Sequence, residues 1–308
     1  MSTISLMVGS FMSFSLLANA SCPTDIDLGF LELGWFKVFI LGIIQGITEL
    51  LPISSTAHMR IVPSLLGWKD PGTAFSAAMQ LASVTAVITY FWKDVKSLSG
   101  ATVRAIAQQD YRDQDFRLAI GLLVGTLPII AGGLLFKKSL NACNSPFRAL
   151  TVIGIASIVM SLLLAMTEKM GNRERSFKQL SLQDGLWVGL AQVLAIIPGV
   201  SRSGSTLTMG LFLGMEREAA AKFSFLLGLP AIILAGSVEL HTLMTAGLNA
   251  EGWGILLVGL VTASISAFAA IYGLLHYLEK RSTWIFVWYR LLMGIFLLIG
   301  VNAGFLKN

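Results

Sequence analysis

The chain has 308 residues, of which 55% are hydrophobic and 13% charged, and its mean hydropathy is +0.75. A soluble domain carries about 25% charged residues, so this chain cannot cover a globular surface with polar groups. The composition excludes soluble, disordered and disulfide-scaffold proteins and predicts a polytopic membrane protein. We attribute the net charge of +5 to basic loops at the cytoplasmic face rather than to nucleic-acid binding. Two cysteines, Cys22 and Cys143, make no metal or disulfide framework, although a bridge is open if both lie outside.

The chain begins with an apolar stretch, residues 1–20, that ends in Ala18-Asn19-Ala20. This small-x-small ending is similar to a signal-peptidase site, but no lysine or arginine precedes the apolar core. A cleaved signal and an uncleaved extension therefore both remain open. We treat residues 1–28 as a signal-like or additional N-terminal segment and residues 29–305 as one integral-membrane domain.

Apolar segments fill the rest of the chain, and several have the length of about 20 residues that a membrane-spanning helix needs. Two of the segments are shorter and interrupted. The first stops at Pro52 and runs into the largely polar stretch 54–58, and the second stops at Pro198 and runs into the largely polar stretch 201–206. The predicted segments are 36–51, 73–92, 118–136, 148–166, 184–197, 205–215, 222–241, 252–275 and 284–305.

The two interruptions are similar to each other in sequence. Matching pairs are Gly42-Ile43-Ile44-Gln45 with Gly189-Leu190-Ala191-Gln192, Leu50-Leu51-Pro52 with Ile196-Ile197-Pro198, and Ala74-Phe75-Ser76 with Lys222-Phe223-Ser224. The offsets are 147, 146 and 148 residues, so the register is nearly constant and indicates an internal duplication. We place repeat one at about 36–166 and repeat two at about 184–305. Paired broken segments are typical of inverted-repeat membrane proteins, whose sites lie where the broken helices meet.

The distribution of lysine and arginine predicts the orientation. If each interrupted segment is a re-entrant hairpin, about six full spans remain in an all-α polytopic fold with an inverted-topology repeat. The loops 93–117, 167–182, 216–222 and 276–283 then lie on one side with thirteen basic residues, against seven on the other. The positive-inside rule puts these loops in the cytoplasm. Both termini are then outside, the first hairpin opens outward and the second opens inward.

Three ionisable residues lie near the interruptions: Glu49, His58 and Arg202. Ionisable groups at membrane depth are expensive and are functional by default. Arg202 stands among the serines, threonine and glycine of residues 201–206, which can donate to anionic oxygens and allow a close approach of the backbone. Arginine binds phosphate through two parallel hydrogen bonds. This set of groups indicates a phosphate or diphosphate ligand.

A carboxylate beside a phosphate usually needs a cation between them. Gln45 and Glu49 are four residues apart, so they share one helical face and offer oxygen ligands for Mg²⁺ or Ca²⁺. Ser55 or Thr56 could supply a nucleophile if His58 takes its proton. The alternative for Gln45 is a hydrogen bond between helices.

Structural roles remain open for the same residues. Serine and threonine are common capping residues at helix breaks, and His58 could be a structural hydrogen-bonding residue. Glu49 and Arg202 could form an ion pair between the two hairpins. Arg290 is a further charge inside the last apolar segment, and its role is left open. Its alternative partners are a helix C-terminus and the carboxylates of Glu239 and Glu279.

Two motifs resemble those of one family. Gln45-Gly-Ile-Thr-Glu49 with the following Pro52-Ile-Ser-Ser-Thr-Ala-His58 is similar to the family's (E/Q)xxxE and Pro-x-Ser-Ser-Thr-x-His motifs. Pro198-Gly-Val-Ser-Arg-Ser-Gly-Ser-Thr206 is similar to its Pro-Gly-x-Ser-Arg-Ser-Gly-x-Thr motif. The family is the undecaprenyl-diphosphate phosphatases of the bacitracin-resistance type, and the resemblance covers about residues 30–305. It implies a metal-dependent membrane hydrolase that removes the terminal phosphate of undecaprenyl diphosphate and recycles the carrier for cell-wall synthesis.

The resemblance also implies roles for individual residues. Glu49 takes the essential carboxylate role, Arg202 binds phosphate, Ser55 is the proposed nucleophile, and His58 matches the family histidine. Many members have glutamate where this chain has Gln45, so Glu49 is expected to be the main ligand of the Mg²⁺ or Ca²⁺ ion. The expected substrate-binding residues are Ser54, Thr56, Ser201, Ser203, Gly204 and Thr206.

The resemblance further implies a bacterial plasma membrane protein whose cleft faces the outside. Interdigitated repeats and two re-entrant helix pairs belong to the same implied fold. The expected partner is a polyprenyl diphosphate lipid, with no nucleic acid, and a homodimer is left open. The alternative function is a polyprenyl-phosphate transporter or flippase that uses the same site, because inverted repeats with broken helices are typical of secondary transporters. Release of phosphate distinguishes the two functions.

Overall fold

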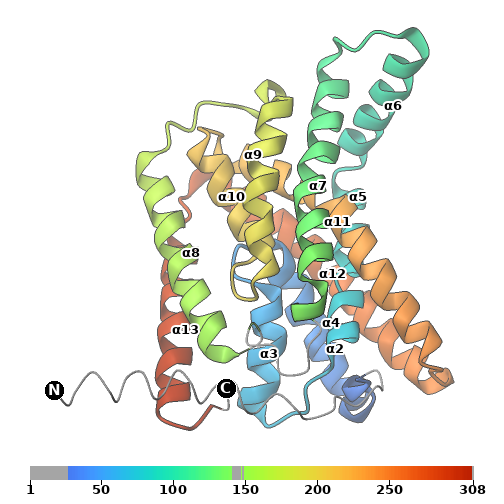
Figure 1. Cartoon of the computed structure of the whole chain (residues 1–308), viewed down its shortest axis with the longest axis vertical. Coiled ribbons are helices and arrows are strands. Elements are labelled where there is room, and N and C mark those ends of the chain that lie inside the picture. Colours follow the sequence, from blue (N-terminus) through green and yellow to red (C-terminus); the bar gives the residue numbers. More distant parts are fainter. Residues whose placement is uncertain (1–26, 141–146, 148, 307–308) are drawn as a thin grey trace.

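The computed structural model describes residues 27–140, 147 and 149–306 (Figure 1). The N-terminal stretch 1–20 and both cysteines lie outside the described residues, so the predictions made for them are not tested. The described residues form helices, with one isolated β-bridge between Arg175 and Met215. The helices are α2 (Gly29–Leu50), α3 (Ser55–Leu66), α4 (Thr73–Ala78), α5 (Leu81–Tyr90), α6 (Trp92–Gln108), α7 (Gln114–Leu140), α8 (Leu150–Met170), η3 (Phe177–Gln179), α9 (Leu182–Gln192), η4 (Val193–Ile196), α10 (Arg202–Phe212), α11 (Arg217–Thr245), α12 (Ala250–Lys280) and α13 (Trp284–Asn302).

Seven helices of the described part are long and apolar enough to cross a membrane. One of them is α2, whose chain turns back through α3 after Leu50, so six full spans remain: α4 with α5, α7, α8, α11, α12 and α13. In Figure 1, α2 and α3 enter from the lower end and α9 and α10 enter from the upper end. The predicted fold class, an all-α polytopic membrane protein with two re-entrant hairpins and an inverted repeat, is confirmed.

Both hairpins turn at a serine in the same unusual conformation. Ser54 has φ 72° and Ser201 has φ 70°, in the left-handed region that favours glycine. Each serine precedes a helix, and its side chain accepts a hydrogen bond from a backbone N–H three residues later, that of Ala57 or Gly204. The capping role considered for these serines is therefore present. The positions are 147 residues apart, so the repeated sequence folds into a repeated turn.

Each hairpin packs against a helix from the other half of the chain. Helix α2 runs along α12, and helix α9 runs along α7. Glycines allow the close approach: a Cβ on Gly46 would lie 2.2 Å from the Ala263 oxygen, and a Cβ on Gly189 would lie 2.1 Å from the Gly125 oxygen. Small residues at such contacts let membrane helices pack backbone to backbone. The two halves are thus interdigitated, which brings the two tips together in the middle of the molecule.

Two features differ from the predicted segments. The apolar segment 73–92 is a span in two pieces, because α4 ends at Ala78 and α5 begins at Leu81, with Gln80 in the break. The basic stretch 93–117 contains the amphipathic helix α6, which projects with the upper part of α7 beyond the body (Figure 1). Length and hydropathy alone did not separate these pieces, because the apolar character continues across the first break.

The four basic loops gather at the upper end of the molecule in Figure 1. Glu168, at the end of α8, is buried there, accepts hydrogen bonds from Arg217 and Thr283 and forms an ion pair with Arg173. A second pair joins the Arg175 guanidinium to both carboxylate oxygens of Asp184 at 2.7 Å. These hydrogen bonds raise the pKa of Arg175 above its ordinary value. Both carboxylates tie the ends of helices α8, α9, α11 and α13 together at this end.

Candidate functional site

The tips of the two hairpins meet at an ion pair between Glu49 and Arg202. Arg202 Nη2 lies 3.0 Å from Glu49 Oε1. The second carboxylate oxygen, Oε2, accepts from the Ser55 hydroxyl at 2.5 Å and from the Gln45 amide nitrogen at 2.9 Å. Glu49 is 6% exposed, and Gln45 and Ser55 are buried as well. The structure therefore brings four of the predicted site residues together, three of them, from both repeats, bound to the buried carboxylate of the fourth.

The predicted serines and threonines divide into two groups. Ser203 joins the tips, because its hydroxyl donates to the carbonyl of Leu51 at 2.9 Å. Thr206 hydrogen-bonds the Arg202 carbonyl and the Ser224 hydroxyl inside the protein, and Ser54 and Ser201 cap helices as described above. Thr56 is exposed and lines a cavity. Most of these hydroxyls therefore form hydrogen bonds within the hairpin tips. The side chain of Thr56 instead faces the cavity.

The histidine lies at the site, but its ring nitrogens have other partners than the nucleophile candidate. Nδ1 of His58 lies 2.7 Å from the Ser54 carbonyl oxygen. A carbonyl can only accept, so Nδ1 carries a proton, which is the single ring proton in the neutral form of the imidazole. Nε2 then accepts from the hydroxyl of Tyr289, 2.5 Å away, and the two rings stack. The hydroxyl of Ser55 is instead bonded to Glu49. The geometry therefore favours Glu49 over His58 as the base that takes the Ser55 proton.

Arg202 has a donor to spare. Its Nη1 atom is buried and has no hydrogen-bond partner among the residues that the structure describes. The guanidinium lies against the backbone of α11, where a Cβ on Gly228 would be 1.9 Å from Nη1. A buried N–H without an acceptor costs about 1–3 kcal/mol, and a phosphate oxygen would supply the acceptor. The spare donor is thus suited to an anionic ligand.

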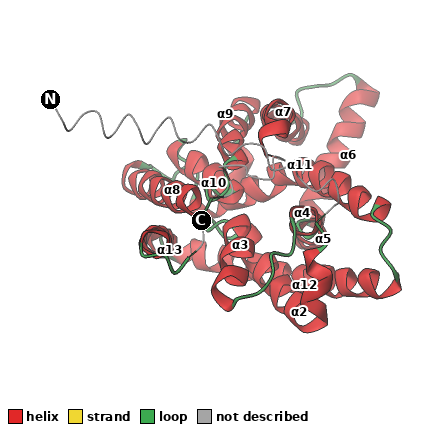
Figure 2. Cartoon of the chain, turned by 60° about the horizontal axis from the view of Figure 1, so that its bottom comes forward, coloured by secondary structure: helices red, strands yellow, loops and turns green. Residues whose placement is uncertain are grey.

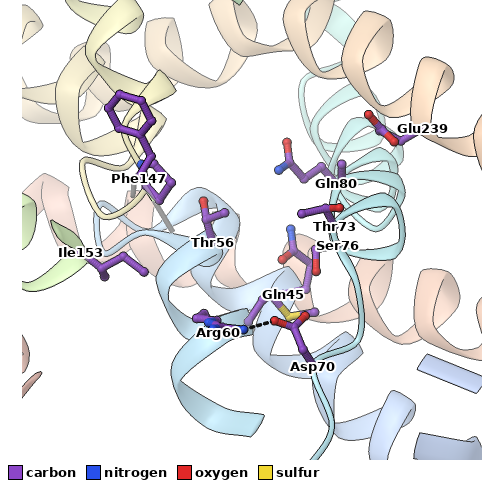
Figure 3. Close-up of a pocket in the computed structure, with 13 residues that line it drawn as sticks. Gln45, Thr56, Arg60, Asp70, Thr73, Ser76, Gln80, Phe147, Ile153 and Glu239 are labelled. Atoms are coloured by element: carbon purple, nitrogen blue, oxygen red, sulfur yellow. Dashed lines mark hydrogen bonds and ion pairs between the residues drawn. The ribbon is translucent and has the colours of Figure 1, made fainter. Parts of the chain in front are cut away.

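A cavity of about 290 Å³ (Figure 3) is lined by Gln45 and Pro198 of the two hairpins and by residues of α3 and α4, which lie in the lower half of the molecule in Figure 1. The ion-paired Arg60 and Asp70 line it as well. Thr56 faces a polar wall across the cavity (Figure 3). That wall comes from α4 and the break that follows it, and its residues are Thr73, Ser76 and Gln80. Figure 2, turned so that the lower end comes forward, shows α3 between α13 and α4.

A second ion pair beyond this cavity joins Lys69 and Glu32, whose side chains are largely exposed. The hydrogen bond that the Lys69 ammonium donates to Glu32 raises the pKa of Lys69. The lower end therefore keeps a positive charge outside the spans at neutral pH. The negative charge of Glu32 balances the positive charge of Lys69. The pair therefore adds no net charge to the lower end, which stays less basic than the upper end.

Three features of the site were not predicted from the sequence. They are the phenol of Tyr289, the polar wall of α4, and the contacts of Arg290. Arg290 does not pair with Glu239 or Glu279 but binds main-chain carbonyls at the hairpin breaks. The sequence singles out Arg290 because it is a charged residue inside an apolar segment, but it does not indicate these carbonyl partners. Nothing in the sequence links Tyr289 to His58, 231 residues away.

Only part of a metal site is present in the protein itself. Within residues 27–140, 147 and 149–306, no group of three histidine, cysteine or acidic side chains could hold an ion. Glu49 is the one carboxylate at the tips; its Oε2 accepts two hydrogen bonds and its Oε1 one. Gln45 donates its amide nitrogen to Glu49, which leaves its amide oxygen as a ligand. Mg²⁺ is commonly held by one or two carboxylates together with substrate phosphates, and these two residues fit that arrangement.

The fold and the site define a multi-pass membrane protein with a buried ion pair at the meeting point of two re-entrant hairpins. The chain matches the family model described as bacitracin resistance protein BacA over residues 38–296 and belongs to that family. It is 52% identical over 301 residues to an undecaprenyl-diphosphatase from Trichormus variabilis, covering 97% of this chain and 94% of that protein. It is 58% identical over 262 residues to undecaprenyl-diphosphatase 2 from Mesorhizobium japonicum, covering 85% of this chain and 99% of that protein.

Proposed function

We propose that this protein hydrolyses undecaprenyl diphosphate to undecaprenyl phosphate and inorganic phosphate. The observation that carries the proposal is the buried contact of Ser55 with Glu49, beside an Arg202 guanidinium that has a spare donor. The names of its relatives support the same reaction. The product is the lipid carrier for cell-wall synthesis, and its recycling would confer resistance to bacitracin.

The Ser55 hydroxyl is the proposed nucleophile. Glu49 takes the hydroxyl proton while Oγ attacks the terminal phosphorus, and the bond to the bridging oxygen breaks. Undecaprenyl phosphate leaves, and water then hydrolyses the phosphoserine to release phosphate. Arg202 neutralises charge on the transferred group, which is the main catalytic device in phosphoryl transfer. Direct attack by water, with Glu49 or His58 as the base, is the alternative, and trapping of phosphate on Ser55 distinguishes the two.

A divalent cation, Mg²⁺ or Ca²⁺, is the proposed cofactor, held by Glu49 and Gln45 together with the diphosphate. The ion would supply positive charge next to the phosphate oxygens. Because the protein offers one carboxylate, we expect weak binding of the ion in the absence of the diphosphate. The change Gln45→Glu adds a second carboxylate and should lower the Mg²⁺ concentration needed for half-maximal activity. Isothermal titration of Mg²⁺ into the lipid-free protein gives a readout besides turnover, and unchanged affinity would count against the assignment.

The bacterial plasma membrane is the proposed location, with the cleft facing the outside. Two observations support this orientation. The four basic loops gather at the upper end of the molecule, and the cavity is lined by residues of α3 and α4 in the opposite, lower half. The diphosphate head would enter the cavity while the prenyl chain remains in lipid between helices. The mass of the detergent-solubilised protein distinguishes a monomer from the homodimer that the sequence left open.

A lipid transporter is the second candidate function. Inverted repeats let a fixed site open to either side of a membrane. Gln192 occupies the position in repeat two that Gln45 occupies in repeat one, and it is buried. Neither polar atom of its amide has a partner among the described residues. The Gln192 amide is therefore a polar group on the second hairpin that is available to a ligand. This observation favours the transporter.

The deciding experiment measures phosphate release from a polyprenyl diphosphate by purified protein, with and without Mg²⁺ or Ca²⁺. Glu49→Ala and Arg202→Ala should lose release, and Glu251→Ala, an exposed residue at the start of α12, should retain it. Release that requires the metal and is lost in both variants supports the phosphatase. A folded protein that binds the lipid and moves it between leaflets without releasing phosphate would support the transporter.

A further inference from the structure

Arg290 lies in the middle of α13 and is 1% exposed, which makes it the largest fully buried side chain of the described protein. Its Nη1 atom donates to the Pro52 carbonyl at 2.9 Å. Its Nη2 atom donates to the carbonyls of Gly199 and Val200, both at 2.8 Å. Pro52 belongs to the tip of the first hairpin, and Gly199 and Val200 belong to the tip of the second. One side chain therefore binds both tips.

The helix breaks explain why carbonyls are available there. A helix that stops leaves carbonyl groups without intrahelical partners, and burial of an unpaired carbonyl is costly. The planar guanidinium carries several donors in a fixed fork and can bind two separated peptide groups at once. Lysine carries a single ammonium and cannot reproduce that fork. The arginine thus satisfies the buried carbonyls of two chain segments and fixes the distance between them.

The reacting groups are close to these contacts along the chain. Pro52 precedes Ser55 by three residues, and Val200 precedes Arg202 by two. Arg290 also packs against the first turn of α10, where a Cβ on Gly204 would lie 2.6 Å from Nη1. The glycine predicted as a substrate-binding residue therefore makes room for this guanidinium.

The charge of Arg290 has no carboxylate partner. Its hydrogen-bond partners in the described chain are the three carbonyls, whereas the charge of Glu49 is matched by Arg202. These three side chains together carry one excess positive charge. An excess positive charge in a buried centre stabilises the state with a bound anion relative to the state without one.

We propose that Arg290 is a positioning residue of the phosphatase site. It holds the two hairpin tips at the spacing that places Ser55 and Glu49 against Arg202, and it acts through the carbonyls of Pro52, Gly199 and Val200. It contacts none of the reacting atoms. This inference rests on the proposed phosphatase function, and its test includes a measurement that does not need turnover.

The first test replaces Arg290 with methionine or lysine and measures kcat and KM for phosphate release. A misplacement of about 1 Å in reacting groups costs about 100-fold, so Arg290→Met should lower kcat by about that factor with KM nearly unchanged. Arg290→Lys should remain well below the wild type, because it keeps the charge but loses the fork. Guanidinium added to Arg290→Ala should restore part of the activity and should not restore Ser55→Ala. The matched control is Arg281→Ala, an exposed arginine after α12.

The second test follows amide hydrogen exchange of the two tips, residues 50–56 and 198–205. Both tips should lose protection together in Arg290→Lys and Arg290→Met, and neither should change in Arg281→Ala. Wild-type kcat or unchanged protection of the tips in Arg290→Lys would overturn the proposal. Should the methionine and alanine variants fail to fold, the lysine variant decides it. Absence of phosphate release by the wild type would reject the phosphatase function, while the exchange measurement would still test the link between the tips.

Discussion

The Glu49 carboxylate organises the site because three donors from three positions converge on it. Two donors come from its own hairpin, Gln45 and Ser55, and one comes from the other hairpin, Arg202. A buried ion pair stabilises little by itself because desolvation offsets most of its Coulomb energy. The ion pair leaves the second nitrogen of Arg202 without a partner in the described chain, as the proposed phosphate ligand requires.

Gly228 is required by the position of Arg202. We expect Gly228→Ala to lower kcat/KM by about 100-fold, because a Cβ would lie 1.9 Å from Nη1 and force the guanidinium away from Glu49. The measurement is phosphate release by the purified variant. Gly133→Ala is the matched control, since no atom lies within 4 Å of its Cβ position. Equal activity of the two variants would show that Arg202 has another productive position.

Tyr289 is expected to act through His58. Tyr289→Phe removes the hydroxyl that hydrogen-bonds Nε2 and should lower kcat by about tenfold. The combination with His58→Ala should be no worse than His58→Ala alone, because residues in one hydrogen-bonded unit are not additive. Tyr272→Phe, an exposed tyrosine of α12, is the control. Additive losses in the double variant would mean that the two residues act independently.

The helix breaks could be predicted from the sequence, whereas their partners could not. Proline and serine at Pro52, Ser54, Pro198 and Ser201 mark the breaks locally, and the constant offset predicts their similarity. Which helix covers a break depends on packing between distant segments. Apart from Arg290, α13 is apolar and gives no periodic signal of its inward face, so the partners of Tyr289 and Arg290 became visible only in the fold.

Helix pairs in this fold are held by glycine contacts rather than by differences in hydropathy, because lipid is as apolar as the helix faces. Gly189→Ala should destabilise the protein by about 1–3 kcal/mol, since its Cβ would meet the Gly125 oxygen at 2.1 Å and separate α9 from α7. Thermal unfolding in detergent measures this. Gly273→Ala, with open space at its Cβ position, should leave the melting temperature unchanged. An unshifted transition in Gly189→Ala would show that the helices can separate at no cost.

The complete molecule is asymmetric between its two ends. The upper end carries the basic loops and the buried Glu168, which binds groups from the ends of three other segments, and α3 and α4, which line the cavity, lie in the lower half. The inverted repeat could be predicted because its halves keep nearly one register. The asymmetry could not, because the repeats have diverged: Glu49, which precedes the Leu50 that matches Ile196, corresponds to Ala195, and Ser55 corresponds to Arg202. Each repeat therefore supplies a different half of one site, and neither half could act alone.

The orientation in the membrane follows from this asymmetry and can be measured with single cysteines. After replacement of Cys22 and Cys143 by serine, we introduce Ser64→Cys near the lower end and Arg112→Cys between α6 and α7 at the upper end, both exposed. A thiol reagent that does not cross membranes should label the first variant in intact cells and the second only after permeabilisation. The reason is that thirteen basic residues at the upper end resist translocation. Labelling with the opposite pattern would reverse the orientation and place the cavity on the cytoplasmic side.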